Sequence, residues 1–95
     1  MSEKARAVRL SGKLICASQH DVEIVKQYLP EHVRLTKAEP GCLSFDVLQT
    51  SDPLVWQVKE CFTDQQAFDE HQLRTRSSDW WQATSKIKRE YDIVS

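Results

Sequence analysis

The sequence predicts an α+β domain of the ferredoxin-like class, with the element order β-α-β-β-α-β. Four stretches alternate apolar and polar residues as strands do, and two longer stretches repeat apolar residues at helical spacing. A turn signal joins the second strand to the third, so these two are expected to form a hairpin. Helices are then expected on one face of an antiparallel sheet. The 95 residues have room for one core, so we expect a single domain over residues 1–95.

The first third of the chain reads as a strand followed by a helix. Residues 1–6 are polar and are expected to be disordered. A strand is expected over residues 8–17, where Gly12 leaves space on the inward face. A helix is expected from Gln19, and Pro30 should either kink it or start a second segment. Its buried stripe consists of Val22, Val25, Leu29, His32 and Val33.

The middle of the chain reads as a hairpin. A turn is expected at residues 39–41, with a glycine that permits positive φ. Strands are expected over residues 42–48 and 54–62, with a second turn at 50–53. The earlier strand should turn Leu43, Phe45 and Val47 to one face. The later strand should turn Trp56, Val58, Glu60 and Phe62 to one face.

The last third reads as helix, short helix and strand. Thr63 or Asp64 is expected to cap the helix. The apolar pattern breaks at residues 74–78, and a shorter helical piece follows over residues 79–84. Residues 89–94 alternate again and form the last expected strand. The inward helical positions are Ala67, Phe68, His71, Trp80, Ala83, Thr84 and Ile87.

The sheet face opposite the helices is expected to be covered by a second copy of the chain. It carries Ile15, Val55 and Cys61, and a domain of this size gains stability from a partner subunit. A copy of the same sheet would cover this face through a two-fold axis. We therefore expect a homodimer.

Composition excludes several classes of partner. The chain is 28 % charged with a net charge of −1, and both signs are mixed, so no basic stripe for nucleic acid is present. No apolar run approaches the roughly 20 residues of a membrane span, and no signal-peptide pattern follows the N-terminus. Cys16, Cys42 and Cys61 are odd in number and far apart, which predicts reduced thiols and a cytoplasmic location.

An acid and an imidazole are aimed at the interior from adjacent layers. Glu60 lies on the inward face of a strand, and His71 lies on the inward face of the following helix. A carboxylate buried alone is costly, so Glu60 needs a partner or a proton. The two groups either lock strand to helix by a hydrogen bond or line a cavity in which Glu60 orients His71 as a general base. His32 is either a satisfied interior histidine or a further functional group.

Large rings are numerous for so small a domain. They either fill the core or form an apolar pocket for a flat aromatic ligand. We take Phe45, Trp56, Phe62, Phe68 and Trp80, together with Arg74, as candidate substrate-binding residues. We expect no metal site, because no ligand pair has the usual spacing, and no nucleotide cofactor, because the chain lacks a glycine-rich phosphate loop.

Three blocks of the sequence form a distinctive pattern: residues 38–45 (AEPGCLSF), 56–64 (WQVKECFTD) and 67–71 (AFDEH). Together they resemble the antibiotic biosynthesis monooxygenase family, whose members are small dimeric α+β-barrel domains. The resemblance covers nearly the whole chain and agrees with the fold read from its periodicity. It implies oxygenation of an electron-rich aromatic, such as a hydroquinone or anthrone, by dioxygen without flavin or metal. In that chemistry His71 would be the base or proton relay, Glu60 would orient it, and aromatic residues would form the walls. His32 is a third candidate catalytic residue, which would shuttle protons with His71 in an isomerase or lyase.

Other branches of the family point elsewhere. One branch degrades heme with an asparagine, a tryptophan and a histidine, but this chain has no asparagine and His71 falls at the position of that tryptophan. Another relative processes the phosphorylated autoinducer-2 signal and shares the spacing from His32 through Glu39 to Phe45. Three hypotheses therefore stand: a cofactor-independent monooxygenase, an isomerase or lyase acting on a small oxygenated metabolite, and a non-enzymatic dimeric binding or stress-related protein.

Overall fold

A computed structural model describes residues 6–95 and confirms the predicted fold class. The elements are β1 (Val8–Ile15), α1 (Gln19–Lys37), β2 (Cys42–Gln49), β3 (Val55–Phe62), α2 (Gln65–Arg76), α3 (Asp79–Thr84) and β4 (Lys88–Val94). The disorder expected for residues 1–6 lies outside the described residues, except at Arg6, which is exposed.

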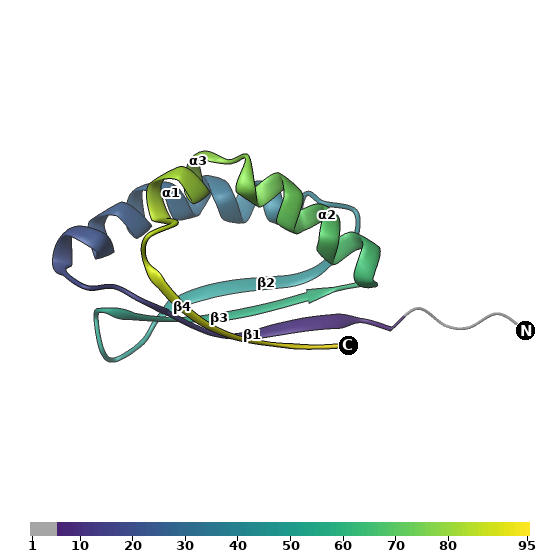
Figure 1. The fold of residues 1–95 in the computed structure, drawn as a ribbon, viewed down its shortest axis with the longest axis horizontal. Coiled ribbons are helices and arrows are strands. Elements are labelled where there is room, and N and C mark those ends of the chain that lie inside the picture. Colours follow the sequence, from purple (N-terminus) through teal and green to yellow (C-terminus); the bar gives the residue numbers. More distant parts are fainter. Residues whose placement is uncertain (1–5) are drawn as a thin grey trace, which may run out of the picture.

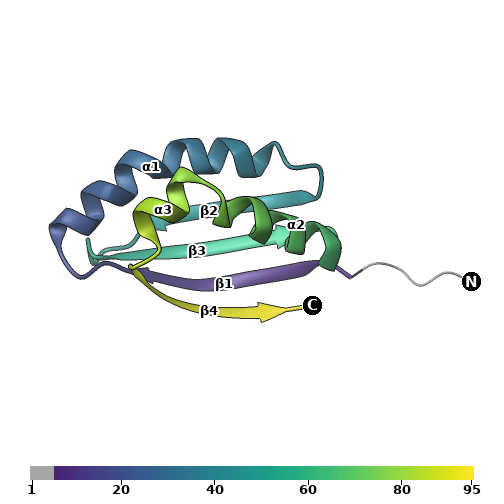
Figure 2. The same cartoon turned by 45° about the horizontal axis from the view of Figure 1, so that its top comes forward.

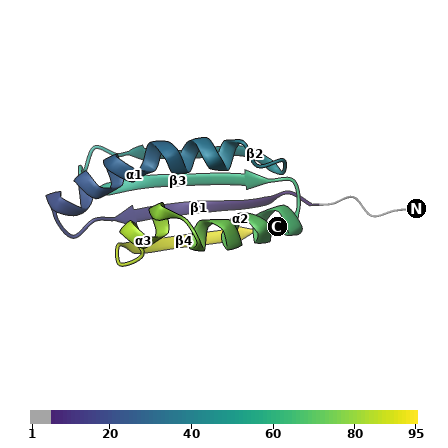
Figure 3. The same cartoon turned by 90° about the horizontal axis from the view of Figure 1, so that it is seen from above.

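Four strands form one sheet in the order β2-β3-β1-β4, and every neighbouring pair is antiparallel. All three helices cover the same face of this sheet (Figures 1 and 2). Seen from above, α1 lies over the β2–β3 half, while α2 and α3 lie over the β1–β4 half (Figure 3). This is the predicted ferredoxin-like arrangement, and it divides the space under the helices into two halves.

The layer between helices and sheet is apolar except at a few positions. Val8, Leu10 and Leu14 of β1 are buried there, as are Val22 and Val25 of α1. Glu60 stands in the middle of this layer, because the strand register places it between Leu10 and Phe45. The sheet therefore presents one carboxyl group to an otherwise apolar interior.

The predicted inward position of Leu43 is wrong. Leu43 is 60 % exposed, because the register of β2 shifts between Cys42 and Ser44, and the extra residue of this bulge leaves the inward face. Of the two alternatives expected at Pro30, a second segment is not formed, since α1 runs unbroken from Gln19 to Lys37. Pro30 is exposed, so water can hydrate the carbonyl that the missing N–H leaves unpaired.

Gly12 provides the predicted space, and the ring of Tyr91 uses it. A Cβ atom at Gly12 would overlap the carbonyl oxygen of Glu90 and lie 2.8 Å from Cδ1 of Tyr91. Glycine therefore lets β4 approach β1 closely, with the Tyr91 ring lying over the inward face.

The opposite face of the sheet is open in the single chain. Leu48 and Val94 are 62 % and 64 % exposed there, and Ile15, Val55 and Cys61 are half-buried. Within residues 6–95, no helix has the length and hydropathy needed to cross a bilayer.

Candidate active site

His71 is held on the inward face of α2. Asp64 caps this helix by accepting a hydrogen bond from the backbone N–H of Ala67 at 2.8 Å. Phe68, His71 and Thr75 then fall on one buried stripe. His71 is only 2 % exposed, and its ring lies 4.8 Å from that of Phe62, so its orientation is fixed by packing.

The carboxylate that binds His71 is Glu39, which lies in the turn after α1. Oε1 of Glu39 is 2.9 Å from Nδ1 of His71, although the two residues are 32 positions apart in the chain. The turn is anchored at both ends: Glu39 N–H donates to Thr36 at 3.0 Å, and Thr63 N–H donates to the Gly41 carbonyl at 2.9 Å. These bonds fix Glu39 beneath α2.

Gly41 acts through its small size. The expected positive φ is wrong, since no glycine among residues 6–95 has one. A Cβ atom at Gly41 would overlap the side chain of Ala67, so only glycine lets the turn approach the first turn of α2 this closely. That approach brings Glu39 within reach of His71.

Arg74 completes the support of Glu39. Its Nε donates to the second carboxylate oxygen of Glu39, and its Nη2 donates to Thr36 Oγ1 at 2.9 Å. Both oxygens of Glu39 are thus occupied, one by the imidazole and one by the guanidinium. Arg74 therefore positions the base and does not face the cavity described below.

The hydrogen bond to Glu39 selects the tautomer of His71. A carboxylate can only accept, so Nδ1 carries the proton and Nε2 carries the lone pair. Nε2 lies 3.4 Å from Thr75 Oγ1 and 3.7 Å from Oε1 of Glu60. Burial lowers the pKa of His71, against the opposing effect of Glu39, so the imidazole is neutral and basic at Nε2 near pH 7.

Glu60 is a carboxyl group that stays protonated to unusually high pH. Burial, and then the negative charge of Glu39, raise its pKa from 4.5 to about 7, against a smaller opposing effect of Arg89. Near neutral pH, Glu60 can therefore either give a proton or take one.

The free energy of unfolding should depend on pH because of the Glu60 carboxyl group. The native protein keeps the Glu60 proton up to about pH 7, whereas the unfolded chain loses it near pH 4.5. Native stability contributed by Glu60 therefore falls as pH rises through this interval and is fully lost above it. Since glutamine does not titrate, Glu60→Gln should gain stability relative to wild type by on the order of 3 kcal/mol between these pH values.

Urea unfolding of both proteins at about pH 5 and about pH 8 measures this difference. Glu70→Gln, at an exposed position of α2, is the matched control and should show no pH-dependent difference. A Glu60→Gln difference that is equal at both pH values would show that Glu60 has no raised pKa.

His32 is a buried, neutral imidazole next to the same space. It is 4 % exposed and stacks on Trp80, with ring centroids 5.0 Å apart and planes 6° from parallel. Its Nδ1 has no hydrogen-bond partner among the described residues. Burial, and then the proximity of the basic groups of His71, Arg74 and Arg89, lowers the pKa of His32 to about 3.

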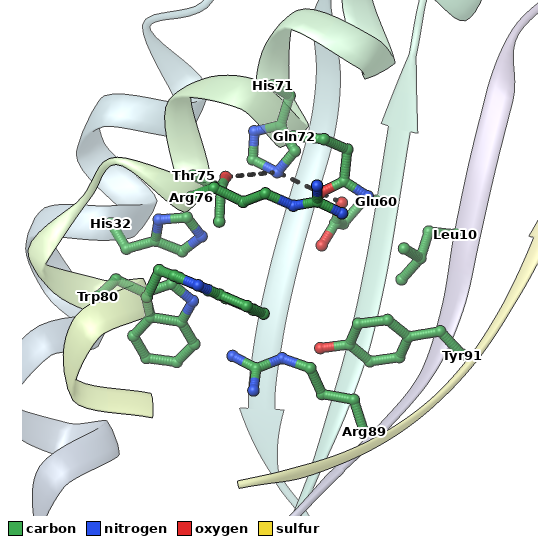
Figure 4. Close-up of a pocket in the computed structure, with 11 residues that line it drawn as sticks. Leu10, His32, Glu60, His71, Gln72, Thr75, Arg76, Trp80, Arg89 and Tyr91 are labelled. Atoms are coloured by element: carbon green, nitrogen blue, oxygen red, sulfur yellow. Dashed lines mark hydrogen bonds and ion pairs between the residues drawn. The ribbon is translucent and has the colours of Figure 1, made fainter. Parts of the chain in front are cut away.

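A cavity of about 190 Å³ opens between these groups, above β1 and β4. The strands contribute Leu10, Glu60, Arg89 and Tyr91. Helix α2 contributes His71, Gln72, Thr75 and Arg76. His32 comes from α1, and Trp80 and Trp81 come from α3. Figure 4 shows His71 and Glu60 at one end of this space and Arg89 with Tyr91 at the other.

The structure brings four of the predicted site residues together at this cavity and places the others elsewhere. His71, Glu60, His32 and Trp80 line it. Phe45 and Phe62 pack against the ring of His71, and Phe68 packs behind Phe62 at 5.7 Å. Trp56 is buried in the core and, like Arg74, does not line the cavity.

Sequence reasoning missed the group that binds His71 and the residues of β4. Glu39 was placed in a turn and in the spacing from His32 to Phe45 that one relative shares, but it was not assigned to His71. Arg89 and Tyr91 carried a weak signal: both fall on one face of an alternating strand. Within residues 6–95, no cluster of three or more His, Cys, Asp or Glu side chains is close enough to hold a metal ion.

The arrangement is suited to moving one proton at a buried aromatic ligand. Nε2 of His71 is an oriented base, Glu60 can accept or return the proton, and the rings of His32, Trp80 and Tyr91 supply flat apolar walls.

Comparison with known families agrees with this geometry. The family model described as antibiotic biosynthesis monooxygenase matches residues 18–85, which include Glu39, Glu60 and His71. No curated protein sequence matches the chain significantly.

Solved structures share the fold at low sequence identity. A Nitrosomonas europaea protein, provisionally named antibiotic biosynthesis monooxygenase, is 16 % identical with a TM-score of 0.79, over 100 % of this chain and 94 % of that chain. A Pseudomonas aeruginosa protein is 20 % identical with a TM-score of 0.76, over 98 % and 96 %. SnoaB of Streptomyces nogalater, described as a cofactor-independent oxygenase, is 15 % identical with a TM-score of 0.73, over 96 % and 93 %. At these identities the likeness establishes the fold alone.

Proposed function

Since this chain belongs to the antibiotic biosynthesis monooxygenase family, we propose that it is a cofactor-independent monooxygenase that oxidises a small electron-rich aromatic of the quinol or anthrone type with dioxygen. The observation that carries the proposal is the neutral His71, oriented by Glu39, with Nε2 directed to a ring-walled cavity. The likeness to a fold relative described as a cofactor-independent oxygenase supports it.

The proposed reaction begins with proton transfer from the aromatic substrate to Nε2 of His71. The resulting anion gives one electron to dioxygen, and the two radicals combine to form a C–O bond. The protonated peroxide then breaks its O–O bond. One oxygen atom remains on the ring as a carbonyl, which in a hydroquinone product tautomerises to the hydroxyl of a hydroxyquinone. The other oxygen atom leaves as water with the two hydrogens that the substrate loses. Glu60, 3.7 Å from Nε2, is placed to exchange protons with the imidazole during these steps.

The size of the cavity favours a substrate with one ring. An engineered apolar cavity of about 150 Å³ in another protein binds benzene. The cavity here is about 190 Å³ and opens to solvent, so a single substituted ring fits inside it and a tricyclic anthrone would project from the mouth. We therefore expect hydroquinones to be better substrates than anthrones.

Oxygen uptake tests the proposal. Purified protein is incubated with hydroquinone, menadiol and an anthrone, and oxygen consumption above the buffer rate is measured with product identification. The expected result is hydroxylated quinone formed with one dioxygen per substrate. Uptake equal to buffer across the panel would refute the monooxygenase.

A second candidate, an isomerase or lyase acting on a small oxygenated metabolite, is favoured by one observation. The cavity carries Arg76 and Arg89 beside its rings, and His32 is turned inward to it. This candidate requires conversion of substrate under nitrogen, which the monooxygenase cannot perform. The non-enzymatic alternative has less support, because a ligand-sized cavity reaches His71.

We also propose that the protein is a homodimer through the open sheet face, as the family leads us to expect. The apolar side chains of Leu48, Val55 and Val94 would be covered there. Sedimentation velocity at micromolar concentration should give twice the chain mass. Val55→Lys should shift it toward monomer, whereas Leu73→Lys, at an exposed position of α2, should not. A wild-type monomer would contradict this interface.

A cytoplasmic location belongs to the same proposal. The three cysteines, Cys16, Cys42 and Cys61, are all free thiols in the structure. Unpaired cysteines are typical of proteins that work in a reducing compartment.

A further inference from the structure

Two arginines line the cavity. Arg89 projects from β4 beside Tyr91, at the end away from His71, and Arg76 extends from the end of α2 across the cavity toward Glu60 (Figure 4). Among residues 6–95, Glu60 is the one acidic side chain that lines the cavity, and it is protonated over much of the acid and neutral range. The space therefore has an excess of positive charge when it is empty.

Arg76 and Arg89 form no ion pair with a carboxylate among the described residues. Arg34 and Arg74, by contrast, each have one. Two guanidinium groups that face one cavity without a counter-charge repel each other and attract an anion.

Arg89 is also rigidly placed. Its Nη1 donates to the carbonyl oxygens of Thr84 at 2.7 Å and Ile87 at 3.0 Å, and its Nη2 donates to Thr84 Oγ1 at 2.9 Å. Its guanidinium carbon lies 5.1 Å from the centre of the Trp81 ring. These partners are neutral, so they fix the guanidinium while its charge remains available to a ligand.

The two ends of the cavity thus differ in chemistry. A ring between His32, Trp80 and Tyr91 would direct one substituent to Nε2 of His71 and the opposite substituent to Arg89, with the Arg76 side chain lying across the cavity between them. The first substituent must give up a proton, and the second must carry negative charge.

We propose that the ligand of this cavity is an aromatic acid, a hydroxylated ring that carries an anionic carboxylate or phosphate, with Arg76 and Arg89 as the anion-binding pair. This inference rests on the proposed function for the role of the ring hydroxyl. The anion subsite itself requires no turnover.

Binding of ligands that cannot be oxidised at useful rates tests the subsite apart from the reaction. Tryptophan fluorescence and calorimetry are used with phenol, 3-hydroxybenzoate and phenyl phosphate. We expect 3-hydroxybenzoate or phenyl phosphate to bind at least about tenfold more tightly than phenol, as charge-assisted hydrogen bonds require. The tighter of the two anions identifies the anionic group, and the advantage should shrink at high salt.

Matched variants locate the effect. Arg76→Gln and Arg89→Gln should each remove most of the preference for the anion, while phenol binds as before. Lys26→Gln removes one positive charge from the exposed face of α1 and should leave the preference unchanged. Arg89 also holds the end of α3, so if Arg89→Gln is misfolded, Arg76→Gln, at an exposed position, decides the question.

Equal affinity for phenol and both anions, no binding of any of them, or equal losses in Arg76→Gln and Lys26→Gln would overturn the inference. Anion preference without oxygen uptake would uphold the subsite and reject the monooxygenase. Oxygen uptake without anion preference would do the reverse.

Discussion

Replacing His71 by alanine should lower substrate-dependent oxygen uptake by roughly 10²- to 10⁴-fold, the range typical for loss of a general base. In the described part of the chain, residues 6–95, His71 is the one histidine that both lines the cavity and has its neutral ring fixed by a carboxylate. Without it, the substrate must lose its proton to water or to Glu60. Steady-state oxygen consumption at saturating hydroquinone measures the change.

Two controls separate a lost base from a damaged fold. His20→Ala removes an exposed histidine at the start of α1 and should keep wild-type uptake. Added imidazole should restore part of the activity of His71→Ala, because the truncated side chain leaves space beside Glu39. If His71→Ala consumes oxygen within a few-fold of wild type, the base is a different group and the proposed mechanism is wrong.

Most of the fold follows from side-chain periodicity, and its errors have local causes. The alternation in β1 and β3 identifies the inward residues correctly, because strand period and burial coincide there. It fails at Leu43, since a bulge shifts the register by one residue and no pattern in a single strand reveals this. It also cannot tell that Pro30 faces solvent, where a helix tolerates it.

The sequence predicted which layer each candidate site residue belongs to, but not which of their atoms are in contact. Periodicity places Glu60 below and His71 above, and the cavity contains both. It does not give the rotation of α2, which turns Nδ1 of His71 toward Glu39 and only Nε2 toward Glu60. The rings of Phe45 and Phe62 were expected at the ligand, but they lie on β2 and β3, whereas the cavity lies over β1 and β4. The position of the cavity over one half of the inward sheet face depends on where the helices lie. The periodicity of a single sequence does not specify that placement.

Replacing Glu39 by glutamine should lower turnover by roughly 10- to 100-fold, the loss typical when a group that orients a histidine is removed. Glu39 touches no part of the cavity, so it is a positioning residue that acts through His71. Its negative charge raises the pKa of His71 against the effect of burial, and glutamine removes that charge. The pKa of the base should therefore fall, and the acid limb of the pH–rate profile should move to lower pH.

If Glu39 only held the turn against α2, the acid limb of the pH–rate profile would not move. The pH–rate profile therefore distinguishes this structural role from an effect of Glu39 on the pKa of His71. Glutamine also has one acceptor oxygen where Glu39 has two, so either Arg74 Nε or His71 Nδ1 loses its acceptor, which should cost on the order of 1–3 kcal/mol of unfolding free energy in urea titrations. Glu31→Gln breaks the ion pair with Arg34 on the solvent side of α1 and is the matched control, for which both the limb and the rate should be unchanged. Wild-type turnover and an unmoved limb in Glu39→Gln would mean that Glu39 only joins the turn to α2. His71 would then owe its orientation to the packing of Phe45 and Phe62 alone.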